Sequence, residues 1–246
     1  MVFLYFCVPG NWAFRLFAGM QKANTMIMDK IFNYVLLDLD GTITDPMLGI
    51  TRCVEYALNH FGIQVDDLRE LCGFIGPPLL DSFRKFYGFS EQQALEAITI
   101  YRERFSCIGL YENKVYPGIE AMLGALKQTG KKLMVATSKP EIFARQILEY
   151  FHLDHYFSFI GGATLDGLRS QKDEVIRYVL EENRIKEVQQ VVMVGDRKFD
   201  IEGAHKAGLS AIGVLYGYGS RKELVEAKAE YIVENVVQLR QLLSGK

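Results

Sequence analysis

The sequence predicts an α/β protein with a doubly wound parallel sheet and a small all-helical segment inserted after its first strand. From about residue 115 onward, short apolar runs of strand length alternate with amphipathic stretches of helix length. An alternation of this length implies right-handed crossovers and a parallel sheet. Residues 47–112 contain no strand-like alternation, and their apolar residues fall at helical spacing.

The composition is that of a globular enzyme. Of the 246 residues, 49% are hydrophobic and 24% are charged, and the formal net charge is −2. No basic excess points to a nucleic-acid polymer or to an anionic membrane surface. The four cysteines contain no CxxC pair and the four histidines no ligand-spaced cluster, which favours reduced thiols and an oxygen-held metal ion. We expect a cytoplasmic protein, a monomer or homodimer, without membrane or nucleic-acid partners.

Residues 1–29 precede the first predicted strand. The apolar run at residues 2–8 ends at Pro9 and follows no Lys or Arg. It is too short to span a bilayer and lacks the basic region of a secretory signal. We expect a poorly ordered extension that the working protein does not need, the alternative being a weak membrane or partner anchor.

The first predicted strand, residues 34–37, runs directly into Asp38-Leu39-Asp40-Gly41. An apolar run bounded by a glycine indicates a buried parallel strand. Such a strand ends at the sheet edge where open α/β folds bind ligands. Two carboxylates two positions apart at that edge are costly unless a cation lies beside them. Alone, this pair is equally typical of a polar turn.

The inserted segment is predicted to contain helices at residues 49–61, 66–72, 79–87 and 91–105. The last begins with a capping box formed by Ser90 and Gln93. We therefore expect a helical cap at residues 47–112 and an α/β core made of residues 30–46 and 113–246.

The rest of the core alternates between strand and helix. Strands are predicted at residues 132–137, 158–161, 191–194, 211–214 and 231–233. Helices are predicted at residues 118–130, 140–151, 172–182, 200–207 and 222–227, followed by a terminal helix.

Polar residues gather at the ends of these strands or in the loops beyond them. The groups are Asp38, Asp40, Gly41 and Thr42; Thr137, Ser138 and Lys139; Lys172; and residues 195–200. Taken singly, Thr137 favours a helix cap, Lys172 a surface lysine, and residues 195–200 a loop that starts a helix. Because the carboxyl ends of parallel strands share one edge, their joint order favours a common crevice.

These residue types suit the hydrolysis of a phosphomonoester. Asp38 can attack phosphorus and form an aspartyl-phosphate, and Asp40 can protonate the leaving oxygen and then deprotonate water. Thr137 and nearby N–H groups can hold phosphate oxygens, and Lys172 can neutralise the charge on them.

The same groups predict a magnesium site. Asp196 and Asp38 supply two carboxylates, the ligands that Mg²⁺ prefers together with water and phosphate oxygens. Asp200, one helical turn further on, could orient that shell or Lys172. We also expect phosphate or substrate contacts from Gly41, Thr42, Ser138 and Lys139.

The segment DLDGT after an apolar strand resembles the first motif of the haloacid dehalogenase-like hydrolases. VATSK resembles the second motif, Lys172 the third, and VVMVGDRKFDIEGA the fourth. The resemblance covers residues 34–233 and implies a Rossmann-like core, with Asp38 as nucleophile and Asp40 as general acid and base. It also implies a metal ligand in the Asp40 backbone carbonyl. Asp173 follows Lys172 where the family often has Pro, which leaves Arg169 as a poorer substitute for Lys172.

The insertion resembles the helical cap of the phosphoglycolate phosphatase-like and 5′-nucleotidase-like branch. Such caps close over the site and exclude water. Within this segment, Arg84 and Lys85 could meet a second anionic group. Aromatic side chains of the segment could stack on a base or simply fill its core; these are Phe83, Phe86, Tyr87, Phe89, Tyr101 and Tyr111.

The leading hypothesis is a Mg²⁺-dependent phosphatase for a small phosphorylated metabolite, such as phosphoglycolate or a nucleoside monophosphate. A phosphomutase of the same fold is the alternative. Dehalogenation is disfavoured because Asp40 has no purpose in displacing a halide. A receiver-like phospho-acceptor is a remote possibility, since such domains are much shorter and have no helical insertion after the first strand.

Overall fold

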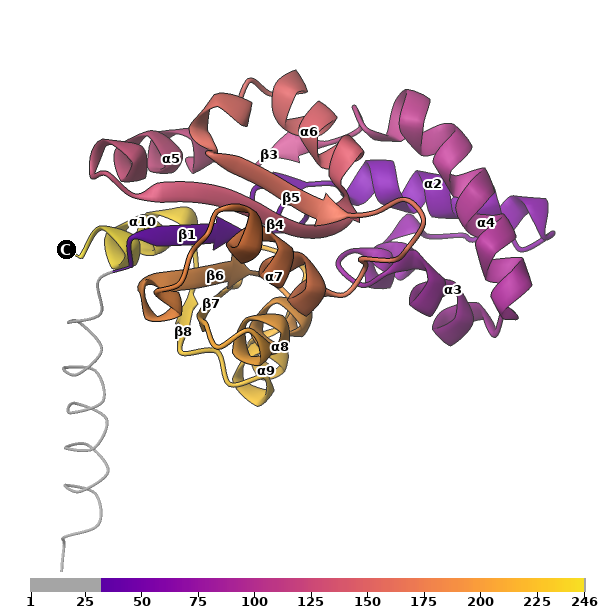
Figure 1. Ribbon diagram of the computed structural model, residues 1–246. Helices are drawn as coiled ribbons and strands as arrows, with labels where there is room; N and C mark the ends of the chain where they lie inside the picture. The colour runs from indigo at the N-terminus through magenta and orange to yellow at the C-terminus, as the bar shows by residue number, and fades with distance from the viewer. Residues whose placement is uncertain (1–31, 246) are drawn as a thin grey trace, which may run out of the picture. The chain divides into compact units, whose positions relative to one another are not determined.

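The computed structural model describes residues 32–245, so the predicted extension at residues 1–29 lies outside the described part. The main sheet has six strands in the order β5-β4-β1-β6-β7-β8, and every adjacent pair runs parallel (Figure 1). The strands are β1 (Tyr34–Leu37), β4 (Lys132–Pro140), β5 (Phe159–Ala163), β6 (Val191–Gly195), β7 (Ser210–Val214) and β8 (Tyr231–Val233). The chain builds outward from β1 on one side and then returns to its other side. The predicted doubly wound parallel sheet is confirmed, with its switch point at β1.

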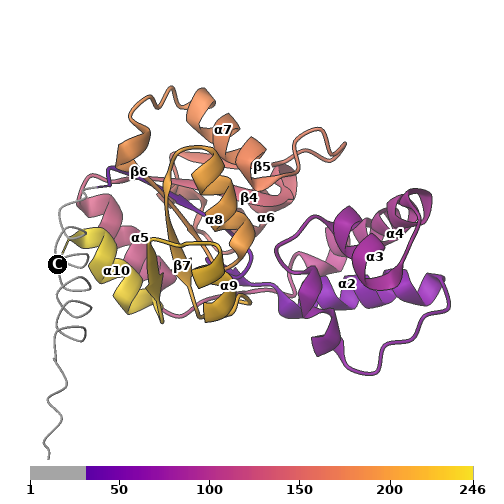
Figure 2. The same cartoon turned by 90° about the horizontal axis from the view of Figure 1, so that it is seen from below.

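Helices cover both faces of this sheet. Val35 and Leu37 pack into a core with α5 (Ile119–Gln128), α6 (Glu141–Tyr150) and α10 (Val236–Ser244). Leu36 faces the opposite core, with α7 (Lys172–Glu182), α8 (Lys198–Lys206) and α9 (Arg221–Glu226). The helices are labelled around the sheet in Figure 2. Successive side chains of a strand point to opposite faces. Burial on both faces is why β1 reads as one continuous apolar run.

Two boundaries in the core differ from the prediction for local reasons. Strand β4 continues to Pro140 instead of ending at residue 137, and its register with β5 shifts between Thr137 and Pro140. Helix α8 begins at Lys198 instead of residue 200. There the Asp200 carboxylate accepts a hydrogen bond of 3.1 Å from the backbone N–H of Arg197 and so completes the first turn.

The inserted segment is helical. It contains α2 (Met47–His60), α3 (Leu79–Tyr87), α4 (Glu91–Arg104), a 3₁₀ segment η1 (Leu68–Phe74) and a π-helical turn η2 (Phe105–Gly109). The expected α-helix at residues 66–72 is thus a 3₁₀ helix, and the capping box at Ser90 is present. Assigning residues 47–112 to a separate cap domain stays a prediction, because Phe32–Ser244 form one compact unit.

A short antiparallel ladder connects the insertion to the core. Strand β2 (Thr44–Asp45) pairs with β3 (Lys114–Val115), so the chain leaves the core and returns to it side by side. The arrows of β1 and β5 point toward α2, α3 and α4 (Figure 1). Among residues 32–245, no helix is both long and apolar enough to cross a bilayer.

Candidate active site

Asp38 lies directly after β1 and is buried. Its backbone N–H donates to the carbonyl of Val194 at 2.9 Å, which continues the β1–β6 pairing by one residue. Its side-chain Oδ1 accepts a hydrogen bond of 2.8 Å from the backbone N–H of Leu39. The strand therefore fixes Asp38 at the carboxyl edge of the sheet, where the sequence placed it.

Lys172, the first residue of α7, reaches this carboxylate from the neighbouring element. Its Nζ lies 2.9 Å from Oδ1 of Asp38 and 2.7 Å from Oδ1 of Asp200, and it donates to the carbonyl of Ala136 at 3.2 Å. Burial lowers the pKa of Lys172, but the charges and hydrogen bonds of Asp200 and Asp38 outweigh burial and raise the pKa above its ordinary value. Lys172 is therefore a buried ammonium shared by two carboxylates.

Three buried carboxylates form one cluster. Asp38, Asp196 and Asp200 each offer an oxygen, and these atoms lie within 4.8 Å of one another. Oδ2 of Asp196 accepts a hydrogen bond of 2.6 Å from the backbone N–H of Tyr218, while its buried Oδ1 has no partner. Burial, followed by the charge of Asp200, raises the pKa of Asp196 well above its ordinary value. Lys172 alone does not balance this cluster, and carboxylate oxygens around a missing positive charge fit a hard divalent cation such as Mg²⁺.

Glycines make room for the cluster. A Cβ atom at Gly41, where φ is +84°, would lie 2.3 Å from Oδ2 of Asp196. A Cβ at Gly217 would lie 2.4 Å from the Cβ of Asp196, and one at Gly219 would lie 1.8 Å from its carbonyl oxygen. The loop after β7 therefore wraps closely around Asp196, and this contact was missed in the sequence.

Two tyrosines of the same loop reach the start of the insertion. The hydroxyl of Tyr216 donates to the carbonyl of Thr42 at 3.0 Å, and the hydroxyl of Tyr218 donates to the carboxylate of Asp45. Thr42 itself is fully buried, with no hydrogen-bond partner for its hydroxyl oxygen. These contacts hold the segment after β1 against the loop after β7.

The Asp40 side chain is not one of the three clustered carboxylates and pairs with Lys139. The Nζ of Lys139 is 2.8 Å from Oδ2 of Asp40, and both side chains are buried. Oδ1 of Asp40 is buried without a partner. Burial raises the pKa of Asp40 above its ordinary value even though the adjacent Lys139 opposes the shift.

Thr137 and Ser138 complete the site from the end of β4. Thr137 is buried, and its Oγ1 accepts a hydrogen bond of 3.2 Å from the backbone N–H of Lys139. Both residues line the same cavity as Asp38 and Asp40. Arg169 lies elsewhere: it donates to the carbonyl of Gly162 at 2.9 Å, and its guanidinium stacks on a tyrosine ring.

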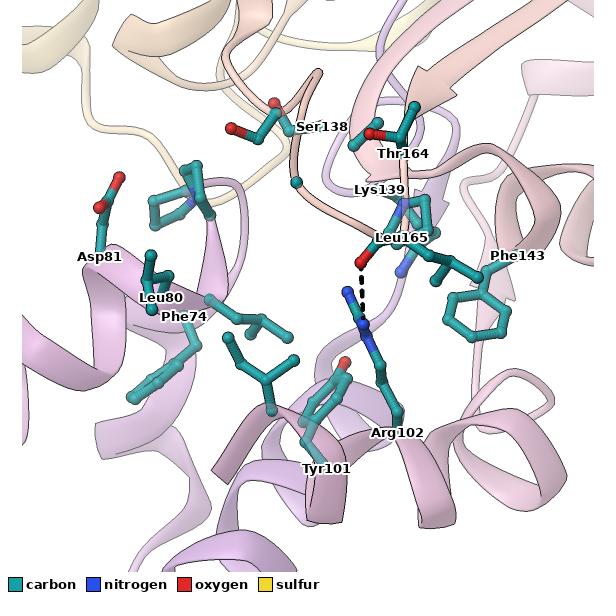
Figure 3. A pocket seen from close by; sticks show the side chains of 18 of the residues that line it. Phe74, Leu80, Asp81, Tyr101, Arg102, Ser138, Lys139, Phe143, Thr164 and Leu165 are labelled. Atoms are coloured by element: carbon teal, nitrogen blue, oxygen red, sulfur yellow. Dashed lines mark hydrogen bonds between the residues drawn. The ribbon is translucent and has the colours of Figure 1, made fainter. Parts of the chain in front are cut away.

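The cavity has a volume of about 490 Å³ and lies between the strand ends and the inserted helices. Much of its lining is apolar or aromatic, including Phe74, Leu80, Tyr101, Phe143 and Leu165 (Figure 3). Arg102 extends from α4 across this space, and its Nη1 donates to the carbonyl of Leu165 at 3.1 Å (Figure 3). The insertion and the loop between β5 and α7 are thus joined by a hydrogen bond in the wall of the cavity.

The structure brings a different arginine to the cavity from the one that the sequence suggested. Arg84 and Lys85 are exposed on α3 and do not line the cavity, because α3 turns the adjacent Ser82 and Phe83 inward. Arg102 lines it instead. Its signal in the sequence was its position next to Tyr101 on the apolar face of α4.

Most of the aromatic side chains singled out in the insertion lie away from the cavity. Phe83 and Phe89 are buried against each other with parallel rings, so they fill the helical core. Phe86 and Tyr111 are about half exposed. Tyr101 is buried and lines the cavity.

Comparisons with known proteins agree on one family. Residues 35–214 match the family model described as haloacid dehalogenase-like hydrolase. A 5′-nucleotidase of Pseudomonas aeruginosa is 47% identical over 211 residues, covering 86% of this chain and 95% of that protein. A phosphoglycolate phosphatase of Haemophilus influenzae is 29% identical over 229 residues, covering 88% of this chain and all of that protein. The crystal structure of a predicted phosphatase from Clostridium acetobutylicum has a TM-score of 0.86 and 51% identity, covering 88% of this chain and 100% of that one.

Proposed function

This chain belongs to the haloacid dehalogenase-like hydrolases and is a phosphomonoester hydrolase, and we propose that it works with Mg²⁺ through an aspartyl-phosphate on Asp38. Its substrate is a small phosphorylated metabolite, of the nucleoside monophosphate or phosphoglycolate type. We further propose that it acts in the cytoplasm as a monomer or homodimer, without nucleic-acid or membrane partners.

The observation that carries this proposal is the buried carboxylate cluster with its single lysine. Lys172 contacts Asp38 and Asp200, while Oδ1 of Asp196 is buried and unpartnered. Isolated carboxylates are not kept buried without compensation. A divalent cation held by Asp38, Asp196 and Asp200, with the carbonyl of Asp40, would supply the missing charge and neutralise a bound phosphate.

The two aspartates after β1 then have separate tasks. Oδ1 of Asp38 is held by Lys172 and by the N–H of Leu39, which leaves Oδ2 to attack phosphorus. The new Oδ2–P bond forms as the bond to the leaving oxygen breaks, and Asp40 gives that oxygen its proton. In the second step Asp40 takes a proton from a water molecule, the water oxygen bonds to phosphorus, and the bond to Asp38 breaks.

Hydrogen-bond donors at the ends of β1 and β4 hold the oxygens of the phosphate group. Thr137, Ser138 and the N–H groups after β1 and β4 can donate to its oxygens, while Lys172 balances charge that develops on them. Such preorganised donors act most strongly where water is excluded. The buried positions of Thr137 and Lys172 support these roles.

The cavity favours a large leaving group. Its volume of about 490 Å³ falls within the range of about 300–1,000 Å³ that is typical of pockets for drug-sized ligands. The rings of Phe74, Tyr101 and Phe143 and the guanidinium of Arg102 offer surfaces for a base and a sugar. We therefore place nucleoside monophosphates ahead of phosphoglycolate as substrates.

A screen of phosphorylated metabolites in Mg²⁺ tests the proposal. It would include nucleoside 5′-monophosphates, phosphoglycolate and sugar phosphates, with EDTA and Asp38→Asn as controls. We expect release of inorganic phosphate that stops in both controls. A phosphomutase would instead convert a sugar phosphate to its isomer without incorporating oxygen from labelled water into phosphate. Phosphate release by Asp38→Asn at the parent rate would contradict the proposal.

A further inference from the structure

We propose that Lys139 is a positioning residue for Asp40, and that Phe105 of the inserted segment completes this arrangement. The inference rests on the proposed function, since it concerns the group that protonates the leaving oxygen. It also changes the role expected for Lys139 from the sequence, which was a phosphate or substrate contact.

The ammonium of Lys139 already has two neighbours. Its Nζ lies 2.8 Å from Oδ2 of Asp40 and 4.5 Å from the centre of the Phe105 ring. The side chain is only 5% exposed. A phosphate on Asp38 would compete with these two neighbours for the ammonium, whereas Lys172 already lies 2.9 Å from Asp38. The two lysines therefore serve different aspartates.

The pairing divides the two oxygens of Asp40. Lys139 holds Oδ2, and Oδ1 is buried without a partner while the residue lines the cavity. An oxygen with a partner is fixed in place, and the free oxygen can carry the proton to the leaving group. Proton transfer depends on a hydrogen-bond distance of about 2.6–3.2 Å. A lysine that fixes the carboxyl plane therefore sets whether Oδ1 meets the leaving oxygen.

Phe105 links this arrangement to the insertion. It begins the π-helical turn η2 directly after α4, and it is 2% exposed. Its ring stacks on Tyr101, with centroids 5.2 Å apart, and meets Phe143 of α6 edge-on at 5.4 Å. The Phe105 ring therefore meets the ammonium from the side of the insertion, and the Lys139–Asp40 pair is nearly closed to water, with side chains only 5% and 10% exposed. Cation–π attraction is stronger when the cation is desolvated.

The test compares two substrates that differ in their need for a proton. One is 4-nitrophenyl phosphate, whose phenolate departs without protonation. The other is the alkyl phosphomonoester that the wild type hydrolyses best among nucleoside monophosphates, phosphoglycolate and sugar phosphates. The quantity measured is kcat/KM, because it reports the step in which the leaving group departs, whichever step limits kcat. The variants are Lys139→Met, Lys139→Arg, Phe105→Leu and Asp40→Asn.

We expect Lys139→Met to lose at least about tenfold more kcat/KM on the alkyl ester than on 4-nitrophenyl phosphate, since general acid catalysis contributes about 10²–10⁴-fold. Lys139→Arg, which keeps the positive charge, should lose less kcat/KM on the alkyl ester than Lys139→Met. Phe105→Leu should also lose more kcat/KM on the alkyl ester than on 4-nitrophenyl phosphate. The expected difference is about 2- to 30-fold, if the ring supplies a cation–π contact of about 0.5–2 kcal/mol. This variant keeps the comparison available if Lys139→Met does not fold.

Equal losses of kcat/KM on both substrates in Lys139→Met would overturn the proposal and favour the phosphate contact expected for Lys139 from the sequence. If Lys139→Met does not fold, equal losses in Phe105→Leu would overturn it. Asp40→Asn separates this failure from a failure of the proposed function. If Asp40→Asn is selective against the alkyl ester while the lysine variant is not, only the role of Lys139 is wrong. If Asp40→Asn is also unselective, Asp40 is not the proton donor, and both assignments are wrong.

Discussion

A methyl group on Gly41 would lie 2.3 Å from Oδ2 of Asp196, so the turn after β1 and the end of β6 meet only because residue 41 has no side chain. The same residue has φ of +84°, which side-chain-bearing residues rarely adopt. One glycine thus joins the first and fourth motifs of the site.

We predict that Gly41→Ala removes most of the activity and destabilises the fold. Its matched control is Gly62→Ala, at φ of +73° with no heavy atom within 4 Å of the added Cβ. The control has only the left-handed backbone strain, about 1–2 kcal/mol, whereas Gly41→Ala also displaces a carboxylate of the cluster. Phosphatase assays and urea unfolding would measure both. Equal losses of activity and stability in the two variants would show that the close approach of Gly41 to Asp196 does not matter for either property.

Removal of divalent metal should lower the thermal stability of the protein. A ligand at one hundred times its Kd stabilises by about 2.7 kcal/mol, which corresponds to roughly 5–10 °C in Tm for a chain of this size. Asp196→Asn should abolish most of the difference between Mg²⁺ and EDTA. Asp81→Asn, an exposed carboxylate that also lines the cavity, should keep it. Thermal unfolding followed by circular dichroism measures all three proteins, and an unchanged shift in Asp196→Asn would exclude Asp196 as a ligand.

Arg102 should determine affinity for the leaving group. Because a hydrogen bond to a charged group contributes about 1.5–3 kcal/mol, Arg102→Met should raise KM about tenfold to hundredfold while changing kcat little. Arg84→Met is the control, since Arg84 is exposed outside the cavity. Steady-state kinetics would measure KM and kcat of both variants on the nucleoside monophosphate that the wild type hydrolyses best. A larger effect at Arg84 would favour the assignment made from the sequence.

Glu112 should stabilise the insertion in a pH-dependent way. Its carboxylate accepts from Arg52 at 2.6 Å and from Arg104 at 2.7 Å, which connects α2 with the end of α4. The hydrogen bonds of Arg104 lower the pKa of Glu112 below its ordinary value of 4.5, against the opposing effect of burial. A lowered pKa gives stability that is present above the ordinary pKa and is lost as pH falls through the folded-state value.

Glu112→Gln should therefore cost about 1–3 kcal/mol of unfolding free energy near neutral pH, and the difference from wild type should shrink as pH falls below 4.5. Glu103→Gln, on the exposed face of α4, should stay within about 0.5 kcal/mol at every pH. Urea unfolding across the pH range provides the measurement. A cost for Glu112→Gln that does not vary with pH would mean that the charge of Glu112 does not matter.

Much of the fold was predictable because parallel strands have a strong signature. Burial on both faces makes a short unbroken apolar run, and right-handed crossovers bring the ends of such runs to one edge. That geometry was enough to place Asp38, Asp196 and Lys172 together without knowledge of any contact. Strands of two residues, such as β2 and β3, are too short to have any pattern.

The directions in which side chains point within the site were harder to predict from the sequence. Nothing in the sequence says whether Lys139 turns toward a phosphate or toward Asp40, because both lie at the same strand ends. The choice between Arg84 and Arg102 depends on which face each helix presents. The apolar residues of α3 fall at helical spacing and leave Arg84 on the polar face, so this signal was present in the sequence and was overlooked. The paired glycines around Tyr218 were a usable signal, since two glycines in a tight loop indicate a close backbone approach.

The most direct test of the account is to look for the phosphoryl group on Asp38. The wild type and Asp40→Asn would be mixed with Mg²⁺ and 4-nitrophenyl phosphate, quenched in acid within one turnover, digested and analysed by mass spectrometry. The account predicts a phosphorylated peptide containing Asp38, with more of it in Asp40→Asn because the second step lacks its base, and none in Asp38→Asn. Phosphate release without that peptide in both proteins, or a phosphoryl group on another residue, would contradict it.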